Sequence, residues 1–302
     1  MSERQFVRNV IGLAVLLLQM GCLSTRPTRP DETKATTRVD VVLPNAHSFV
    51  LPRTGGAGSY RIFVALPQSY HESSTRYPVL YTLDANAGFA LITQTHRILR
   101  VDSTTPDVII VGIGYDGPGP ERRARRGKDL TPTHRPSDSN TGGSKEFLAF
   151  LAEIVVPFVD SNYRTIPQNR VIHGHSLGGL FALYALFHQP DLFRRYIVSS
   201  PSLWWDDAVM LKVEAEFAQL HTSLPTTVFL SVGANEPEDM LEHFAPFVDA
   251  LRSRNYAGLT LDAVVLPDED HLSIMGPAFV RGLRAVFRST DPEAATATPV
   301  SR

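Results

Sequence analysis

Between residues 60 and 288 the chain alternates short apolar runs with longer segments of helical periodicity. The apolar runs are rich in β-branched and aromatic residues, as is typical of buried strands. They cover residues 60–67, 78–84, 107–115, 170–175, 194–200, 226–233 and 259–267. The segments with helical periodicity cover residues 145–162, 177–188, 206–221, 238–254 and 273–287. Strands that alternate with helices predict an α/β fold, with a mostly parallel sheet covered by helices on both faces.

Two segments lack this alternation. Residues 23–40 are polar, contain prolines and show no apolar periodicity, which predicts a flexible linker. Residues 289–302 have the same character and are expected to form a disordered tail. The residues between them, 41–288, show no internal repeat, and their number suits a single domain.

The N-terminus has the pattern of an export signal. Arg4 and Arg8 precede the apolar run 10–21, which is shorter than the length a transmembrane helix needs. The small Gly21 then precedes Cys22, the only cysteine of the chain. We therefore expect residues 1–22 to be a signal peptide of lipoprotein type, with lipidation at Cys22 and a periplasmic or cell-envelope location. Simple secretion and a retained anchor are the alternatives.

The overall composition is that of an ordinary globular protein. The chain has 302 residues, 43% of them hydrophobic, and a net charge of -2. This near-neutral balance gives no reason to expect a nucleic acid as partner. A single cysteine excludes an intrachain disulfide.

A G-x-S-x-G pattern is centred on Ser176. It follows the apolar run 170–175 and precedes the helical segment 177–188. A serine at so sharp a strand-to-helix turn needs small neighbours, and Gly174 and Gly178 supply them. The start of the helix directs free N–H groups towards developing negative charge. The pattern therefore predicts a nucleophile; a tight turn without chemistry is the alternative.

His173 and His175 flank Gly174 and raise the question of a metal site. No third ligand lies nearby in the sequence, so we interpret both as structural histidines. Neither a metal nor a cofactor is expected.

A serine nucleophile needs a base and an acid, which follow it in the chain order Ser, acid, His in α/β-hydrolases. His271 comes after the last predicted strand and is the expected base. Glu236 is the first carboxylate after the strand 226–233 and is the expected acid, which would orient the imidazole. Competing carboxylates lie in the same two loops: Glu238, Asp239, Asp268, Glu269 and Asp270.

An oxyanion hole needs two backbone donors. The residue after the nucleophile, Leu177, supplies the first N–H group. The strand 78–84 ends at Asp84 and is followed by small residues, so the N–H group of Asn86 is the candidate for the second.

Six sequence blocks occur in a characteristic order: PVLYTLDANAGF, KDLTPT, GHSLGGLFALYAL, SPSLWWDD, VGANE and DEDHLSIMGPAFVRGLRAVF. In combination they resemble the esterase D-like branch of α/β-hydrolases. Within this branch the chain is most similar to the periplasmic siderophore esterases, which open catecholate trilactones. The resemblance covers nearly all of residues 40–288.

The resemblance implies an α/β-hydrolase catalytic domain that needs no cofactor, with Ser176 as nucleophile and His271 as base. Some relatives use a Ser–His dyad, so a mechanism without Glu236 is the alternative. The chain has Ala85 where the family usually has glycine, which alters the oxyanion loop. The branch also includes S-formylglutathione hydrolases and mycolyltransferases, but the cysteine-containing loop of the former is absent.

Two features bear on the substrate. The predicted loop after residues 107–115 carries a run of basic side chains, of which Arg122 and Arg123 are the first candidates to contact an anionic substrate. The alternative is a solvated charged loop. Trp204 and Trp205 offer flat apolar faces to an aromatic acyl group. We expect one of them to be core and the other to line the cleft.

These observations predict a serine esterase that hydrolyses carboxylic esters through an acyl-enzyme. A siderophore-type trilactone or another aromatic acyl ester is the expected small-molecule substrate. Acyl transfer to an alcohol and siderophore binding without turnover are the alternatives.

Overall fold

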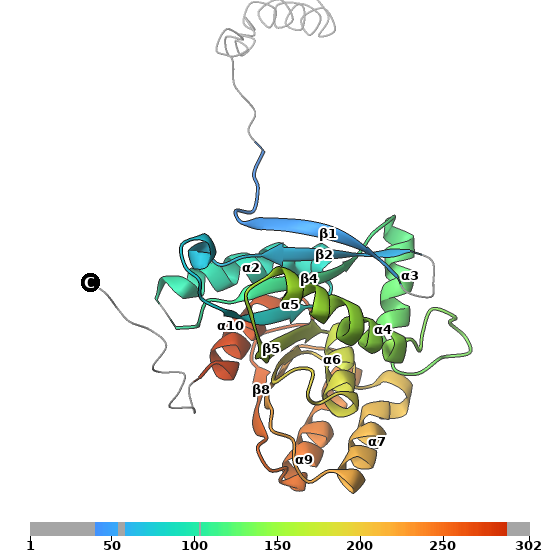
Figure 1. Ribbon diagram of the computed structural model, residues 1–302. Helices are drawn as coiled ribbons and strands as arrows, with labels where there is room; N and C mark the ends of the chain where they lie inside the picture. Colours follow the sequence, from blue (N-terminus) through green and yellow to red (C-terminus); the bar gives the residue numbers. More distant parts are fainter. Residues whose placement is uncertain (1–39, 54–57, 103, 289–302) are drawn as a thin grey trace, which may run out of the picture. The chain divides into compact units, whose positions relative to one another are not determined.

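Eight strands form one sheet in the computed structural model, which describes residues 40–53, 58–102 and 104–288 (Figure 1). Their order across the sheet is β1-β2-β4-β3-β5-β6-β7-β8. Their bounds are β1 Ala46–Pro52, β2 Ser59–Ala65, β3 Tyr77–Thr82, β4 Ile109–Tyr115, β5 Thr165–His175, β6 Arg195–Ser199, β7 Thr227–Gly233 and β8 Thr260–Leu266. Strand β2 pairs antiparallel with β1 and β4, and all other neighbouring pairs of this sheet are parallel, so the predicted mostly parallel sheet is confirmed.

Helices connect the parallel strands. Their bounds are η1 Gln68–His71, α2 Ala85–Val101, α3 Gly119–Leu130, α4 Ser144–Phe150, η2 Leu151–Val155, α5 Val156–Asn162, α6 Leu177–His188, α7 Trp205–Leu220, α8 Glu238–Glu242, α9 Phe244–Arg254 and α10 Met275–Val286. From Leu43 onward the described residues form one compact unit.

The helices cover both faces of the sheet, as predicted. Phe89 and Ile92 of α2 share an apolar cluster with Phe279 and Leu283 of α10 on one face. The opposite face carries a larger cluster, to which α4, α6, α7 and α9 contribute buried aromatic side chains. Helix α6 is buried over almost its whole length, because it lies between the sheet and the outer helices.

The basic run after β4 is a helix, not the predicted loop. Residues 119–130 form α3, with a proline in its first turn. Arginine, alanine, lysine and leucine favour helices, and proline is tolerated at the first helical positions. The glycines at 119 and 127 concealed this pattern. Strand β1 and helix α2, which begins directly after Asp84, were not predicted from the sequence.

The predicted helix 238–254 is two helices that meet at His243, and the predicted helix 145–162 passes through a short π-helical segment, η2. Cys22, the predicted signal peptide, residues 23–39 of the predicted linker and the tail 289–302 lie outside the described residues. Within the described ranges, no helix is long and apolar enough to span a membrane.

The carboxyl ends of the parallel strands meet at one edge of the sheet. The segments after β3, β5, β6, β7 and β8 bring Asp84, Ser176, Ser200, Glu236 and His271 to this edge. Open α/β sheets bind their ligands at such an edge. Residues nearly 190 positions apart in the chain therefore come together at one place.

Candidate active site

Ser176 occupies a strained turn between β5 and α6. Its backbone angles are φ 59° and ψ −124°, in a region that residues other than glycine rarely adopt. A Cβ atom at Gly174 would collide with the backbone of Gly178, so the turn requires glycine there. The N–H group of Ser176 donates to Ser199 at 3.0 Å, and its carbonyl accepts from Ser202 at 3.2 Å. These bonds hold the hydroxyl at the edge of the sheet.

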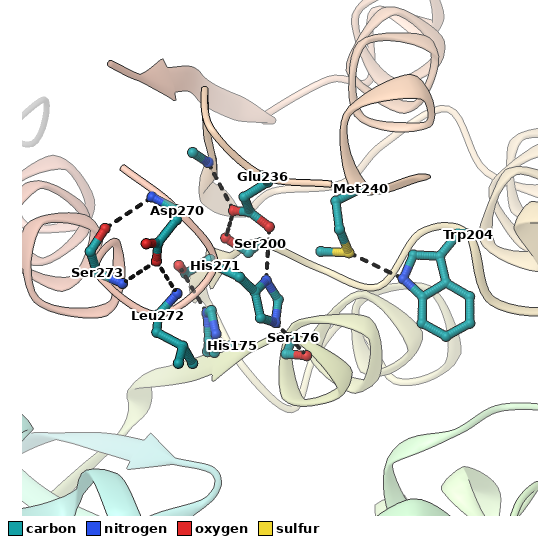
Figure 2. A network of polar contacts seen from close by, with 12 residues as sticks. His175, Ser176, Ser200, Trp204, Glu236, Met240, Asp270, His271, Leu272 and Ser273 are labelled. Carbon is teal, nitrogen blue, oxygen red and sulfur yellow. Dashed lines mark hydrogen bonds and ion pairs between the residues drawn. The ribbon is translucent and has the colours of Figure 1, made fainter. Parts of the chain in front are cut away.

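His271 lies between Ser176 and Glu236 (Figure 2). The distance from His271 Nε2 to Ser176 Oγ is 3.1 Å, and the distance from Nδ1 to Glu236 Oε2 is 2.8 Å. With the proton on Nδ1, the imidazole donates to Glu236 and accepts from Ser176. The predicted serine, histidine and glutamate thus form one hydrogen-bonded chain.

The loop that carries His271 is fixed by Asp270. Its carboxylate accepts the N–H groups of Leu272 at 2.8 Å and Ser273 at 2.9 Å, as Figure 2 shows. These bonds from the backbone lower the pKa of Asp270. These bonds fix the backbone on both sides of His271, whose imidazole extends towards Ser176 and Glu236.

Glu236 is 5% exposed and is the carboxylate that reaches His271. Its other oxygen, Oε1, accepts the hydroxyl of Ser200 and the N–H group of Gly233. Burial alone raises the pKa of Glu236, but the bonds from His271, Ser200 and Gly233 outweigh it and lower the pKa overall. The side chain is therefore held as an anion.

The competing carboxylates point elsewhere. Glu238, Asp239 and Asp268 are exposed. Glu269 accepts the hydroxyl of Ser273 at 2.6 Å, and Asp270 caps the turn described above. Of the six candidates, only Glu236 is both buried and bonded to the imidazole.

The two predicted oxyanion donors stand at helix starts. Leu177 is the first residue of α6, and Asn86 lies in the first turn of α2, where N–H groups have no partner within the helix. The side chain of Asn86 bonds to the backbone of Tyr115. Its Oδ1 accepts the N–H group of Tyr115 at 2.7 Å, and its Nδ2 donates to the Tyr115 carbonyl at 3.0 Å. This pair of bonds ties the start of α2 to the end of β4.

Asp84 brings the two helix starts together. It has a left-handed backbone with φ 55°, and a Cβ atom at Gly178 would come within 3.3 Å of its Oδ2. Its carboxylate receives a forked pair of bonds from Arg126, at 2.6 Å and 2.8 Å. Helix α3 is thereby attached to the edge where the catalytic candidates lie.

The arginines of α3 divide into two groups. Arg126 binds Asp84, and Arg125 donates to the carbonyl groups of Ser59 and Asp116. Arg122 and Arg123, the predicted substrate contacts, are exposed on the same helix, one turn further from Asp84. Arg126 is therefore the arginine of α3 that lies at the sheet edge with Asp84 and Ser176.

The two tryptophans differ in burial, as expected. Trp205 is 6% exposed and donates through its indole N–H group to Thr133. Trp204 is part-exposed, and its indole N–H group lies 3.1 Å from the sulfur of Met240. Figure 2 shows Trp204 and Met240 on the same side of His271 as Ser176. Trp204 is therefore the more exposed of the two tryptophans.

Arg135 was not singled out in the sequence. Its guanidinium carbon lies 3.9 Å from the centre of the Trp205 ring and 5.4 Å from the Trp204 ring. Such cation–π contacts hold the charge against the aromatic faces. The residue follows the KDLTPT block, but no local pattern distinguishes it from other loop arginines.

His173 and His175 are neutral side chains packed behind the site. Burial lowers the pKa of His173 to about 3, and burial with the nearby His271 lowers the pKa of His175 to about 4. The rings of His175 and His271 are 4.6 Å apart, and His175 Nδ1 is 3.3 Å from the hydroxyl of Ser199. Within the described residues, no three side chains of His, Cys, Asp or Glu type are placed to hold a metal ion.

Comparisons with known proteins show the family of the chain. The Esterase family model matches residues 57–255. The ferri-bacillibactin esterase BesA of Bacillus subtilis is 29% identical over 279 residues, which cover 87% of this chain and 96% of BesA. The siderophore triacetylfusarinine C esterase of Aspergillus fumigatus is 31% identical, over 82% of this chain and 94% of its own.

A solved structure shows the same fold. The crystal structure of the BES protein from Bacillus cereus has a TM-score of 0.76 and 28% identity, and the match covers 83% of this chain and 98% of that one. The α/β-hydrolase architecture predicted from the sequence is confirmed by this likeness and by the sheet order. The chain is therefore a serine esterase that belongs to the Esterase family.

Proposed function

We propose that the protein hydrolyses the ester bonds of a siderophore, with Ser176 as nucleophile and an acyl-enzyme as intermediate. The observation that carries this proposal is the chain of hydrogen bonds from Ser176 through His271 to Glu236. The names of the similar proteins, which are siderophore esterases, supply the substrate class. None of these names describes a transferase or a binding protein, the two alternatives drawn from the sequence.

The first half of the reaction forms the acyl-enzyme. His271 Nε2 takes the proton of the Ser176 hydroxyl while Oγ bonds to the ester carbonyl carbon. The carbonyl electron pair moves onto its oxygen, which the N–H groups of Leu177 and Asn86 stabilise. When this oxyanion collapses, the C–O bond of the ester breaks, and the departing alkoxide takes the proton from His271.

The second half repeats these steps with water. His271 takes a proton from water, the hydroxide attacks the acyl carbon, and Ser176 leaves with the proton returned by His271. Glu236 keeps the imidazole in the tautomer that accepts from serine and stabilises its charged form. The lowered pKa of Glu236 suits this role, because the carboxylate stays ionised.

Trp204 and Arg135 are the proposed contacts for the acyl part of the substrate. The exposed part of Trp204 offers an apolar ring face, and Arg135 beside it offers a positive charge for an anionic aromatic group. Trp205 is buried beneath Arg135 and supports this pair from below. Arg122 and Arg123 remain proposed contacts for the outer part of a large anionic substrate.

Hydrolysis tests the proposal directly. The purified protein is assayed with a catecholate trilactone, feruloyl esters and p-nitrophenyl acetate, and the released acid and alcohol are identified by mass spectrometry. We expect ester hydrolysis, and a loss of about a thousandfold or more in kcat for Ser176→Ala. Unchanged turnover by Ser176→Ala would refute the nucleophile assignment.

The substrate contacts need a separate variant. Arg135→Ala should raise KM for an anionic aromatic ester by about tenfold, because a charged contact is lost, and leave KM for p-nitrophenyl acetate unchanged. Arg252→Ala removes an exposed arginine of α9 and is the matched control. An equal change in KM for both esters would show that Arg135 does not interact with the negative charge of the substrate.

Export and a lipid anchor at Cys22 are proposed on the sequence pattern alone. The predicted linker of residues 23–40 would then separate the catalytic domain from the membrane. Metabolic labelling with a fatty acid, compared between the native chain and Cys22→Ser, tests this. The native chain should take up the label in the membrane fraction; an unlabelled Cys22 there contradicts the anchor.

A further inference from the structure

Ser200 has an unusual backbone for a residue with a side chain. It follows β6 directly, is fully buried, and has φ 46°, in the left-handed region that favours glycine. Its N–H group donates to the carbonyl of Ser231 in β7 at 2.7 Å, which fixes this backbone against the neighbouring strand. Glycine would relieve the strain, so the serine side chain needs another explanation.

The hydroxyl of Ser200 supplies that explanation. It donates to Oε1 of Glu236, the oxygen that also accepts the N–H group of Gly233 at 2.9 Å. The opposite oxygen, Oε2, faces His271. As Figure 2 shows, the carboxylate is thus held from both sides and cannot turn away from the imidazole without breaking a buried bond.

We propose that Ser200 is a positioning residue, which fixes the Glu236 carboxylate so that it orients and stabilises His271 during ester hydrolysis. This inference rests on the proposed function, and it adds a fourth residue to the serine, histidine and glutamate. The hydrogen bond that the Ser200 hydroxyl makes goes to Glu236. Ser200 acts on the reaction only through Glu236.

The first consequence is a lower kcat when the hydroxyl is removed. A hydrogen bond to a buried charge contributes enough to change a rate by about tenfold when that charge stabilises the transition state. Ser200→Gly removes the hydroxyl and suits the left-handed backbone. We therefore expect kcat to fall by about tenfold, KM to change by less than twofold, and the melting temperature not to decrease.

Ser231→Ala is the matched control. Ser231 is also fully buried, in β7, but its hydroxyl donates to the carbonyl of Val198 at 3.4 Å, away from Glu236. This variant should keep the kcat of the native enzyme. Ser200→Ala, which leaves the strain in place, provides a second measurement should the glycine variant fold poorly, and it should lose kcat to a similar extent.

The second consequence concerns the pH profile. A carboxylate that is held less firmly stabilises the imidazolium less, so the acidic limb of kcat/KM should move to lower pH in Ser200→Gly. Other groups face this pair: His175 packs on His271, Asp270 precedes it and interacts with its charge, and Asp84 and Arg126 lie at the same edge. They are unchanged in the variant, so the shift reports the bond between Ser200 and Glu236.

A double-mutant cycle separates positioning from a structural role. In a Glu236→Ala background the hydroxyl has no carboxylate to hold, so Ser200→Gly should lower kcat by less than twofold. A tenfold loss in that background, or an unchanged kcat and pH profile in Ser200→Gly alone, would overturn the inference. An active Ser176→Ala enzyme would instead overturn the proposed function, so the two failures are distinguishable.

Discussion

Two of the buried carboxylates among the described residues lie in contrasting surroundings, Glu236 beside His271 and Asp129 at the end of α3. Both side chains are fully shielded from solvent. Glu236 accepts bonds from His271, Ser200 and Gly233, and its pKa is lowered. Burial raises the pKa of Asp129 to about 6, although the Tyr60 hydroxyl bonds to it at 2.8 Å.

The two carboxylates differ in the donors that reach them and in the depth at which they are buried. Asp129 accepts the hydroxyl of Tyr60, and the Arg53 nitrogen is 3.5 Å from its Oδ1. The Tyr115 hydroxyl and the charge of Arg125 also lower its pKa, but burial outweighs all of these. At Glu236 the bonds from His271, Ser200 and Gly233 outweigh the effect of burial on the pKa. Donors to a buried carboxylate thus extend the pH range in which it stays ionised towards lower pH.

Glu236→Gln should have the largest effect on activity. The amide cannot stabilise a positive imidazole and favours the wrong tautomer, so kcat should fall by about 10² to 10⁴-fold with little change in KM. Steady-state kinetics on p-nitrophenyl acetate measures this. Asp129→Asn, the matched change at the other carboxylate, should keep kcat within about twofold. A loss of less than threefold for Glu236→Gln would show that a Ser–His dyad suffices.

Asp129→Asn should change the pH dependence of stability. The folded protein binds the proton of Asp129 more tightly than the unfolded chain, so this group makes the native enzyme less stable as pH rises from about 4 through about 6. The full effect is about 2–3 kcal/mol. Urea unfolding of both proteins at pH 4 and pH 7 measures it. A difference between the two proteins that is the same at both pH values contradicts the raised pKa.

Glu236 should show the opposite sign. Its pKa is lowered, so its ionised form contributes stability above the usual pKa range of a glutamate, and this contribution is lost as pH falls. The unfolding free energy of Glu236→Gln should therefore decrease less on acidification below about pH 4.5 than that of the native enzyme. A parallel decrease in both proteins would sink this assignment.

Tyr60→Phe should give the smallest effect. The ring keeps its stacking on Phe150, with centres 4.2 Å apart, but loses the bond to Asp129. A net loss of about 1 kcal/mol in the free energy of unfolding is expected, with unchanged kcat. Thermal unfolding and the ester assay check both. A changed kcat would connect Asp129 to the reaction and remove the contrast with Glu236.

Much of the fold follows from the sequence because its signals are local. Seven of the eight strands and the helices that follow residue 144 were recognised from apolar runs and periodicity. Strand β1 escaped because it is half-exposed at the edge of the sheet and lacks a continuous apolar run. Helix α3 escaped because glycines and charges conceal its pattern.

The site divides in the same way. Ser176 could be found because a strained turn demands glycines at fixed spacing, and Glu236 and His271 because strand order dictates where they stand. Ser200 and Arg135 could not be found from the sequence, because the roles proposed for them depend on tertiary contacts. Nothing in the sequence shows that Ser200 faces Glu236 or that Arg135 lies over Trp205.

The central claim is that Ser176 is the residue that becomes acylated. Intact-protein mass spectrometry after treatment with a fluorophosphonate, followed by peptide mapping, tests it most directly. The account predicts one adduct, on Ser176, with loss of esterase activity in proportion to labelling and no adduct in Ser176→Ala. Labelling of another residue, or full hydrolysis by the modified enzyme, would contradict it.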